Sequence, residues 1–301
     1  MQTVRYIIKR VLLAALSLFM IVTLTFFLMN LMPGDPFMSE KATEENRAIL
    51  IAKYGLDKPV YVQYGRYLKN LLRGDMGTSY VLQKGRAVRD IIGESFGISM
   101  QVGIKALILA IIAGLILGCI AGLRKDKLSD NVIRIFTSIG ISMPSYVIAS
   151  ILLIVLAVNL NLLPISYKKD GGWIMPTITL AMYPTSYLAR LTRASILEVM
   201  NQDYLRTERA KGMSEMVVVF IHALKNSLIP VITYVAPLTA SILTGGFVAE
   251  SVFNVPGLGR YFVSCISSRD YTMIMGITIF YSSLIIFMNL VCDILYKIVD
   301  P

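Results

Sequence analysis

The sequence predicts an all-α integral membrane protein with about six transmembrane helices and both termini on the cytoplasmic side. Hydrophobic residues make up 55% of the 301 residues and charged residues only 16%, whereas soluble domains carry roughly 25% charged residues. The apolar residues form stretches of about 20, the length that a helix needs to cross a bilayer. The basic residues behind the net charge of +10 collect between those stretches, which is the pattern of the positive-inside rule.

Six stretches have the length and the apolar character of a spanning helix. The first follows basic residues, as in a signal peptide, but its apolar part is too long and no small-x-small cleavage site follows, so we expect it to be retained. The fourth is the least apolar and contains Pro176 and Pro184, which a spanning helix tolerates when neighbouring helices satisfy the freed carbonyls. The expected spans are residues 11–31, 99–123, 132–156, 173–191, 228–252 and 272–296.

Basic residues in the short loops determine the expected orientation. They are abundant in the N-terminal segment and in the loops after the second and fourth spans, and scarce in the loops on the opposite side. Residues 32–95 are then extracellular, where apolar residues at helical spacing predict two short amphipathic helices, the second after Pro59. We therefore expect three parts: residues 1–31 with the first span, the insertion 32–95, and a five-helix core over 96–301 that includes a cytoplasmic loop at 194–227.

The loop at 194–227 is long for a connection between two membrane helices. Asp203 is expected to cap a short helix, and Gly212 to end it, because glycine readily adopts the left-handed backbone of a helix stop. A second helix over 215–224 would then lead to the fifth span. A helix, turn and helix along the membrane surface can receive a push from a soluble partner, although a solvated amphipathic loop on the lipid surface explains the composition as well.

The segment DYLRTERAKGMSE, followed by HALKNSLIP, resembles the coupling loop of permease subunits in ATP-binding-cassette importers, in the variant of the dipeptide and oligopeptide permeases. NLMPGDPF at 30–37, KYGLDKP at 53–59, GDMGTS at 74–79, and ESVFNVPGLGR with SRDY between the last two spans fit the same family in the same order. The resemblance implies an importer permease fold and ATP-driven uptake of peptides. Importers of nickel and of glutathione share this architecture and remain alternatives.

The resemblance further implies that this loop seats in a cleft of a cytoplasmic ATPase subunit. Ala210 and Gly212 would permit the close approach, while Arg206, Arg209 and Lys211 would face polar groups of the partner. Glu208 stands where the peptide-permease branch typically has alanine. The expected coupling residues are Tyr204, Arg206, Thr207, Glu208, Arg209, Ala210, Lys211 and Gly212.

The partners implied by the resemblance are a second homologous permease, two ATPase subunits that bind ATP and Mg, and an extracellular or periplasmic peptide-binding protein, besides membrane lipid. The sequence contains no G-x-x-x-x-G-K-[ST] phosphate loop, so we expect neither enzyme activity nor a bound cofactor in this chain. No metal site is expected, because there is a single histidine and the three cysteines are widely spaced. Without a basic patch on a soluble domain, nucleic-acid binding is not expected either.

A translocation path should be lined by small, polar or helix-breaking residues, which are costly toward lipid. Ordinary helix packing explains the small residues equally well. Glu250 either meets the amine of a bound peptide or pairs with a basic neighbour such as Arg260, and we prefer the second reading. The candidate path residues are Ser142, Ser145, Tyr146, Thr244, Gly245 and Glu250.

Two other classes fit the sequence less well. A secondary transporter would need ionisable residues near the membrane midplane for ion coupling, and the central turns of the expected spans carry almost none. An intramembrane enzyme would need a nucleophile and a base in one cleft, and no such set lies at membrane depth in the sequence.

Overall fold

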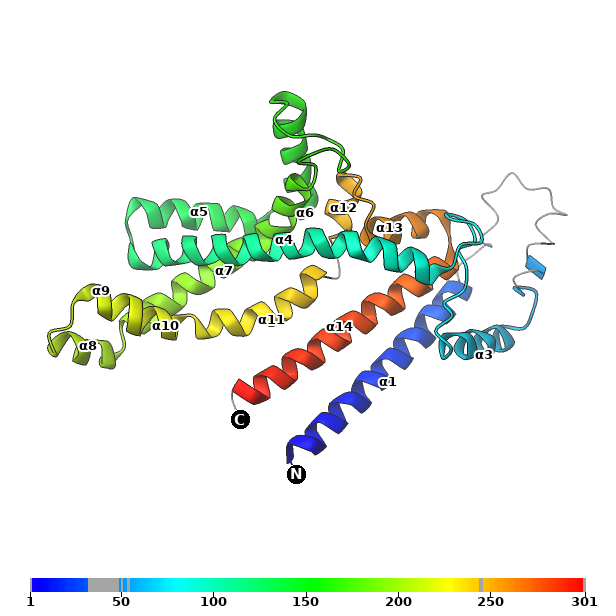
Figure 1. The fold of residues 1–301 in the computed structure, drawn as a ribbon, viewed down its shortest axis with the longest axis horizontal. Helices are drawn as coiled ribbons and strands as arrows, with labels where there is room; N and C mark the ends of the chain where they lie inside the picture. Colours follow the sequence, from blue (N-terminus) through cyan, green and yellow to red (C-terminus); the bar gives the residue numbers. More distant parts are fainter. Residues whose placement is uncertain (1, 32–48, 50, 53–54, 244–245, 300–301) are drawn as a thin grey trace. The chain divides into compact units, whose positions relative to one another are not determined.

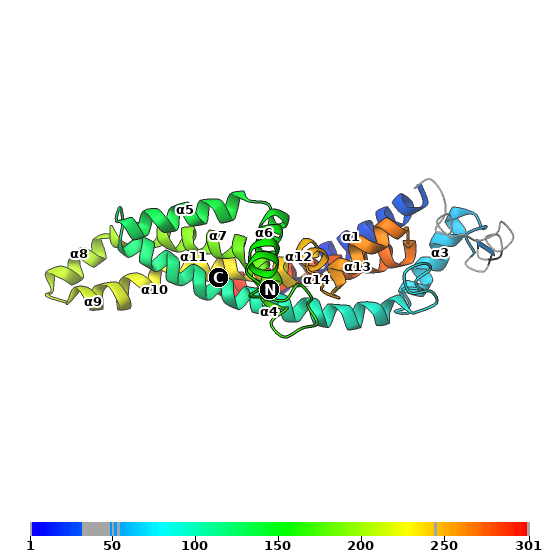
Figure 2. The ribbon, with the colours of Figure 1, turned by 90° about the horizontal axis from the view of Figure 1, so that it is seen from above.

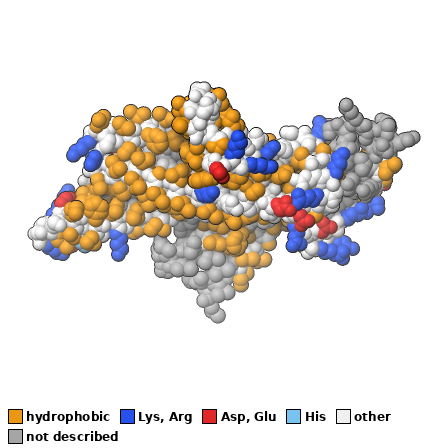
Figure 3. All heavy atoms as spheres, turned by 45° about the horizontal axis from the view of Figure 1, so that its top comes forward, with side chains coloured by type: hydrophobic (Ala, Val, Ile, Leu, Met, Phe, Trp, Pro, Cys, Tyr) orange, Lys and Arg blue, Asp and Glu red, His pale blue; other side chains and the backbone are white. Residues whose placement is uncertain are grey.

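The computed structural model describes residues 2–31, 49, 51–52, 55–243 and 246–299. The described part is helical, and the only pairing of extended backbone in it is one isolated bridge between Thr78 and Ala87. The chain forms two compact units, which we call the first unit (Met1–Ser99 with Pro256–Leu295) and the second unit (Met100–Val255 with Tyr296–Pro301). Figure 3 shows apolar side chains over most of the visible face and charged ones confined to patches, as expected for a protein surrounded by lipid.

The first unit combines both ends of the sequence (Figure 1). Arg10 of α1 and Asp293 of α14 form an ion pair at 2.9 Å. The helix expected after Pro59 is confirmed as α3, whereas most of the helix expected before it lies outside the described residues. The helices of this unit are α1 (Gln2–Leu31), α3 (Val60–Leu71), the beginning of α4 (Val88–Leu123), α13 (Leu258–Ser268) and α14 (Tyr271–Val299).

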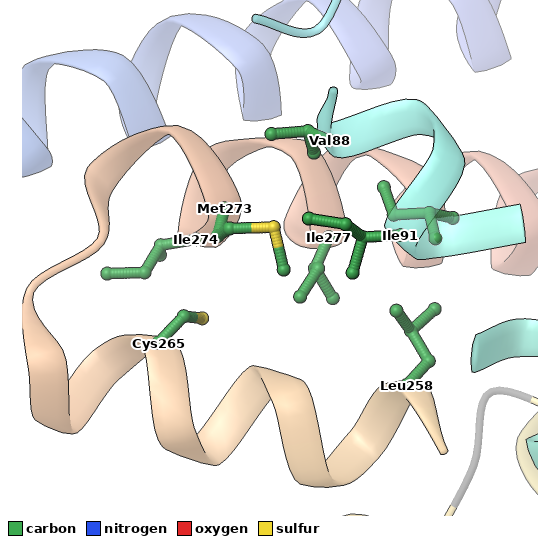
Figure 4. Close-up of a cluster of buried hydrophobic side chains, with 8 residues drawn as sticks. Val88, Ile91, Leu258, Cys265, Met273, Ile274 and Ile277 are labelled. Atoms are coloured by element: carbon green, nitrogen blue, oxygen red, sulfur yellow. The ribbon is translucent and has the colours of Figure 1, made fainter. Parts of the chain in front are cut away.

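The core of the first unit lies where α4, α13 and α14 meet. Leu258 and Cys265 of α13 point toward α14, and the first turn of α4 closes the cluster with Val88 and Ile91 (Figure 4). All four side chains are at most 1% exposed. This packing joins residues separated by well over 100 positions in the sequence, so it holds the start of α4 together with α13 and α14 in one unit.

Asp270, which directly precedes α14, organises the polar part of this unit. Its carboxylate accepts hydrogen bonds from the Ser79 hydroxyl at 2.5 Å and from the backbone N–H groups of Tyr80, Val81 and Leu82 at 3.1 Å. The residue is fully buried. A carboxylate at a helix N-terminus is favoured by the helix dipole, and here it also holds the loop that precedes α4.

Asp270→Asn is expected to destabilise the protein by about 3 kcal/mol, because hydrogen bonds to a charged group contribute about 1.5 to 3 kcal/mol. The new amide NH₂ would also face the backbone N–H donors that now point at an acceptor. The temperature at which half of the purified protein remains monodisperse measures the loss. Asp75→Asn is the control, because its carboxylate is exposed and accepts one backbone bond, from Gly77 at 2.8 Å. Equal melting temperatures for both variants would contradict this role for Asp270.

The second unit is built around α7 (Figures 1 and 2), which contacts α5, α6, α10, α11 and α12. Its helical segments run in chain order from the end of α4 to α12. They are α5 (Leu128–Ser142), α6 (Ser145–Leu152), the π-helix η1 (Leu153–Asn159), α7 (Ile174–Met200), α8 (Asp203–Ala210), α9 (Glu215–Val217), the π-helix η2 (Val218–Ala223), α10 (Leu224–Ser227), α11 (Ile229–Leu243) and α12 (Phe247–Val252).

A ladder of small residues packs α4 against the rest of the second unit. Ala106 and Ala110 are fully buried, and Gly114, Gly118 and Gly122 continue the same four-residue spacing. A Cβ atom on Gly118 would lie 2.5 Å from the Thr192 Cβ and 2.7 Å from the Ala189 carbonyl oxygen of α7. The two backbones therefore touch directly, a contact that small residues permit in membrane helices.

Three helical runs in the described residues are long and apolar enough to cross a membrane: Ile8–Leu31, Val88–Leu123 and Tyr271–Asp293. The segment Glu215–Val252, apart from residues 244 and 245, is a fourth, and α5 through η1 is a fifth if it counts as one span. The all-α membrane fold is thus confirmed. The fourth expected span is helical, as α7, whose 27 residues reach about 40 Å, yet it is less apolar than these runs. Its prolines, its tyrosines and Arg190 lower its mean hydropathy, as do the buried Thr177, Thr179 and Thr185. A helix enclosed by other helices can carry such residues because it needs no apolar surface toward lipid.

The expected continuous third span is wrong, because the chain bends by 110° between α5 and α6. Met143 has extended backbone angles (φ −80°, ψ 129°) and Pro144 follows it. Proline disfavours the α conformation of the residue before it and lacks the N–H that would continue the helix. The prolyl ring thus ends α5 and starts α6 in a new direction.

Candidate functional site

The loop after α7 folds as the helix, glycine turn and helix that the sequence predicts. Gly212 has a φ of +82°, the left-handed conformation that favours glycine, so its expected role as a helix stop is confirmed. The second helix continues from α9 through η2 to α10. The expected cap is off by one residue: α8 starts at Asp203, and Gln202 occupies the cap position. Asp203 instead lies in the first turn, where a carboxylate favours the helix dipole.

Apolar burial and polar pairs hold this element to the end of α7. Leu205 is fully buried against Val218 and Ala223, with Met200 packed beside them. Arg209 binds the Glu215 carboxylate through Nε at 3.0 Å and Nη2 at 2.8 Å, and these hydrogen bonds raise the pKa of Arg209. α8 therefore keeps a fixed orientation on the segment that leads into α11.

The opposite side of α8 is exposed and forms what we call the coupling surface: Arg206, Thr207, Ala210, Lys211 and Gly212. The other expected coupling residues bind within the loop. Tyr204, which is 38% exposed, accepts a hydrogen bond from Asn226 at 2.8 Å, Arg209 is engaged by Glu215, and Glu208 pairs with Lys211 at 3.2 Å. On the coupling surface, Lys211 and Arg206 stay exposed although each has an acidic neighbour within the loop, which for Arg206 is Asp203 at 3.5 Å.

The candidate path residues do not gather on one described surface. Ser142, Ser145 and Tyr146 lie at the break between α5 and α6, and all are exposed. Thr244 and Gly245 lie outside the described residues. Glu250 is fully buried on α12. Burial of the Tyr167 side chain raises the pKa of Tyr167, and the charge of Glu250 raises it further. Its suggested partner Arg260 belongs to the first unit, and a path role for these residues stays a prediction.

A buried ion pair joins α5 to α7 near the start of the coupling element. The Arg193 guanidinium donates from Nε and Nη2 to the two oxygens of Asp130, each at 2.7 Å. The backbone N–H of Asp126 donates to the same carboxylate at 3.0 Å. The Asp130 side chain is fully buried and that of Arg193 is 21% exposed, so this bidentate pair is among the strong kind of charge contacts.

Arg193→Gln is expected to destabilise the protein by about 3 kcal/mol, because it leaves the Asp130 carboxylate buried without its cation. Arg193→Lys keeps the charge but cannot bind both oxygens of Asp130 at once, and should lower the stability by about 1 kcal/mol. Thermal unfolding of the purified variants measures both. The matched control is Arg190→Gln on the same helix, where the guanidinium is exposed and, among the described residues, donates a hydrogen bond to the Ser138 hydroxyl alone, at 3.0 Å. A control as unstable as Arg193→Gln would contradict the assignment.

Reasoning from the sequence missed the structural importance of Asp130 and Asp270. For Asp270 a signal was present, since a carboxylate directly before a long apolar helical run is typical of a helix start. For Asp130 and Arg193 no local pattern exists, because their 63-residue separation places the contact beyond any helical periodicity.

Comparison with known proteins assigns nearly the full chain to the same family that the motifs resemble. Residues 114–301 match the family of binding-protein-dependent transport system inner membrane components, and residues 3–110 match the N-terminal component of such systems. The dipeptide transport system permease protein DppB of Lactococcus lactis subsp. cremoris is 43% identical, over 99% of this chain and 98% of its own.

Two further relatives support the same assignment. DppB of Bacillus subtilis is also 43% identical, over 99% of this chain and 97% of its own. The oligopeptide transport system permease protein OppB of Haemophilus influenzae is 39% identical, over 99% and 98%. The resemblance seen in the motifs is thereby confirmed, and the chain belongs to the multi-pass inner membrane components of binding-protein-dependent transport systems, in their dipeptide and oligopeptide permease branch.

Proposed function

We propose that this chain forms one half of the pathway by which an ATP-driven importer moves peptides across the cell membrane. The observation that carries the proposal is the 43% identity, over 99% of the chain, to a protein named as a dipeptide permease. A second homologous permease would complete the pathway, two ATPase subunits would hydrolyse ATP with Mg, and an extracellular binding protein would deliver the peptide. This permease would then perform no hydrolysis itself.

The coupling surface supports a mechanical role in such a complex. Exposed residues of α8 offer positive charge and a glycine turn to a soluble subunit, while the Leu205 contact and the Arg209 pair with Glu215 make α8 and α9 one body. α8 follows α7 after Asn201 and Gln202, and α10 leads into α11. In this proposal, closure of the two ATPase subunits displaces α8 and α9. The displacement acts on α7 and α11 together and opens the pathway toward the outside of the cell.

Two steps test the proposal. Gentle solubilisation of the tagged chain, followed by mass spectrometry, should recover a second permease and ATPases. The purified complex, reconstituted into vesicles with its binding protein, should then take up labelled dipeptides or oligopeptides only when ATP is present on the side of the membrane where the ATPase subunits lie. Uptake of nickel or glutathione in place of peptides would reject the substrate class and keep the importer. Transport by the isolated chain without ATP would reject both.

A further inference from the structure

The first unit contains a pocket of about 280 Å³ whose lining includes none of the expected coupling or path residues. It is enclosed by α1, α3, the loop before α4 and the start of α14, all of which belong to this unit. Its polar lining comes mainly from α3 and the end of α1, and its apolar lining from the membrane helices. The residues that matter for its chemistry are Phe26, Met29, Asn30, Arg66, Asn70 and Met275.

The pocket lies where two membrane spans end. Asn30 is in the last turn of the span Ile8–Leu31, and Tyr271 and Thr272 begin the span Tyr271–Asp293. Phe26 and Met275 lie about one turn farther into these two helices. The pocket therefore opens at the level where a bilayer changes from hydrocarbon to headgroups.

α3 is attached to α1 at this same level. The rings of Phe26 and Tyr67 stack with centroids 5.5 Å apart, and the hydroxyls of Thr23 and Tyr64 share a hydrogen bond of 2.8 Å. Because Thr23 lies about two turns before the end of the span, α3 rests along the membrane rather than above it. On its other sides Tyr61 is 76% and Val60 42% exposed, as for an amphipathic helix in contact with lipid.

Arg66 supplies the pocket with a cationic group for an anionic ligand. Arg66 forms no ion pair with any residue that the structure describes, and neither Lys69 nor Arg66 has an acidic neighbour within α3. One carboxylate, that of Asp75, also lines the pocket, and it is oriented by its hydrogen bond from the Gly77 N–H at 2.8 Å. Asn30 and Asn70 add amide groups that can bind ester or phosphate oxygens.

We propose that the pocket holds the headgroup of one phospholipid from the leaflet at this end of α1, with its phosphate on the Arg66 guanidinium. The volume is that of about nine water molecules, enough for a phosphate and a glycerol but not for acyl chains. The chains leave along α1, where Phe27, Leu28 and Leu31 are 41%, 58% and 78% exposed. Guanidinium groups suit this site because their planar fork matches phosphate oxygens.

The test is native mass spectrometry of the purified full-length transporter, which counts the phospholipids retained as detergent is removed. Wild type should retain one phospholipid per copy of this chain more firmly than the rest. Arg66→Gln should weaken that retention by roughly tenfold, the loss expected for one charge-assisted hydrogen bond. Lys69→Gln removes the same charge from the same helix outside the pocket and should retain the lipid as wild type does. Should Arg66→Gln fail to fold, Arg66→Lys, which keeps the charge and loses the fork, is expected to give an intermediate loss.

Three outcomes overturn the proposal. The first is equal retention by wild type and Arg66→Gln, and the second is an equal loss in Lys69→Gln. The third is displacement of the retained lipid by millimolar inorganic phosphate, which would indicate a site for a free anion that does not use the acyl chains. None of these readouts depends on transport, so the result stands apart from the proposed substrate.

Discussion

Gly212→Asp is expected to reduce ATP-driven uptake by at least about tenfold, a loss of roughly 1.4 kcal/mol in coupling, while the chain stays folded and inserted. Aspartate is one of the few residues that tolerate the left-handed conformation, here a φ of +82°. A Cβ on Gly212 would meet no atom of this chain within 4 Å. The added carboxylate would therefore project from the coupling surface toward the ATPase subunit, where close approach is proposed.

Two matched variants separate charge from backbone effects. Gly212→Asn has the same shape without the charge, so an intermediate loss is expected from it. Gly85→Asp places the same residue at a similar φ of +77°, also with nothing within 4 Å, and should transport normally. Uptake by proteoliposomes and ATPase activity of the same preparations are the two measurements. Normal transport by Gly212→Asp would reject docking at this surface, even if the importer assignment holds.

Gly118→Leu is expected to remove most of the folded protein. Its Cβ alone would stand 2.7 Å from the Ala189 carbonyl oxygen, a backbone atom that cannot rotate away, so α4 and α7 must separate along their whole contact. Overpacking of this kind typically costs 1 to 3 kcal/mol and at times more, and the loss of adjacent backbone contacts adds to it. Fluorescence-detected size-exclusion chromatography should show that most of the monodisperse peak is lost.

Gly93→Leu is the control for that experiment, because it lies on the same helix and a Cβ there meets nothing within 4 Å. Leucine has a higher helix propensity than glycine by up to about 1 kcal/mol, so this variant should be as stable as wild type or more so. A stable Gly118→Leu protein would show that α4 and α7 can part without unfolding the second unit.

The sequence predicted features that depend on composition and short-range pattern. The C-terminal end of α1 and the start of α14 follow from unbroken apolar runs, and the turn at Gly212 from the freedom of glycine, whereas α1 begins at Gln2, nine residues before the expected span. The bend at Met143 was not predicted, although Pro144 was visible, because proline inside a membrane helix is compatible with a continuous span when neighbours satisfy the backbone. Only the packing around α5 and α6 decides between the two.

Within the candidate site, the sequence predicted the location of the coupling element better than the role of each residue. Arg206 pairs with Asp203 one turn earlier at 3.5 Å and stays exposed, whereas Arg209 is engaged by Glu215 from beyond the glycine turn. That difference depends on how α9 folds back on α8 after the turn. Side-chain partners across a turn are set by three-dimensional packing, which no periodicity encodes.

The bend between α5 and α6 has a consequence for hydration. Where a helix stops, its last four carbonyl groups lack helical partners, as do the first four N–H groups of the helix that follows. In hydrocarbon each such group would cost several kcal/mol, so broken backbone persists at membrane depth only beside protein or water. Ser142, Pro144 and Ser145 are exposed at this break, so we expect water or another polypeptide, rather than acyl chains, to cover that flank of the second unit in the membrane.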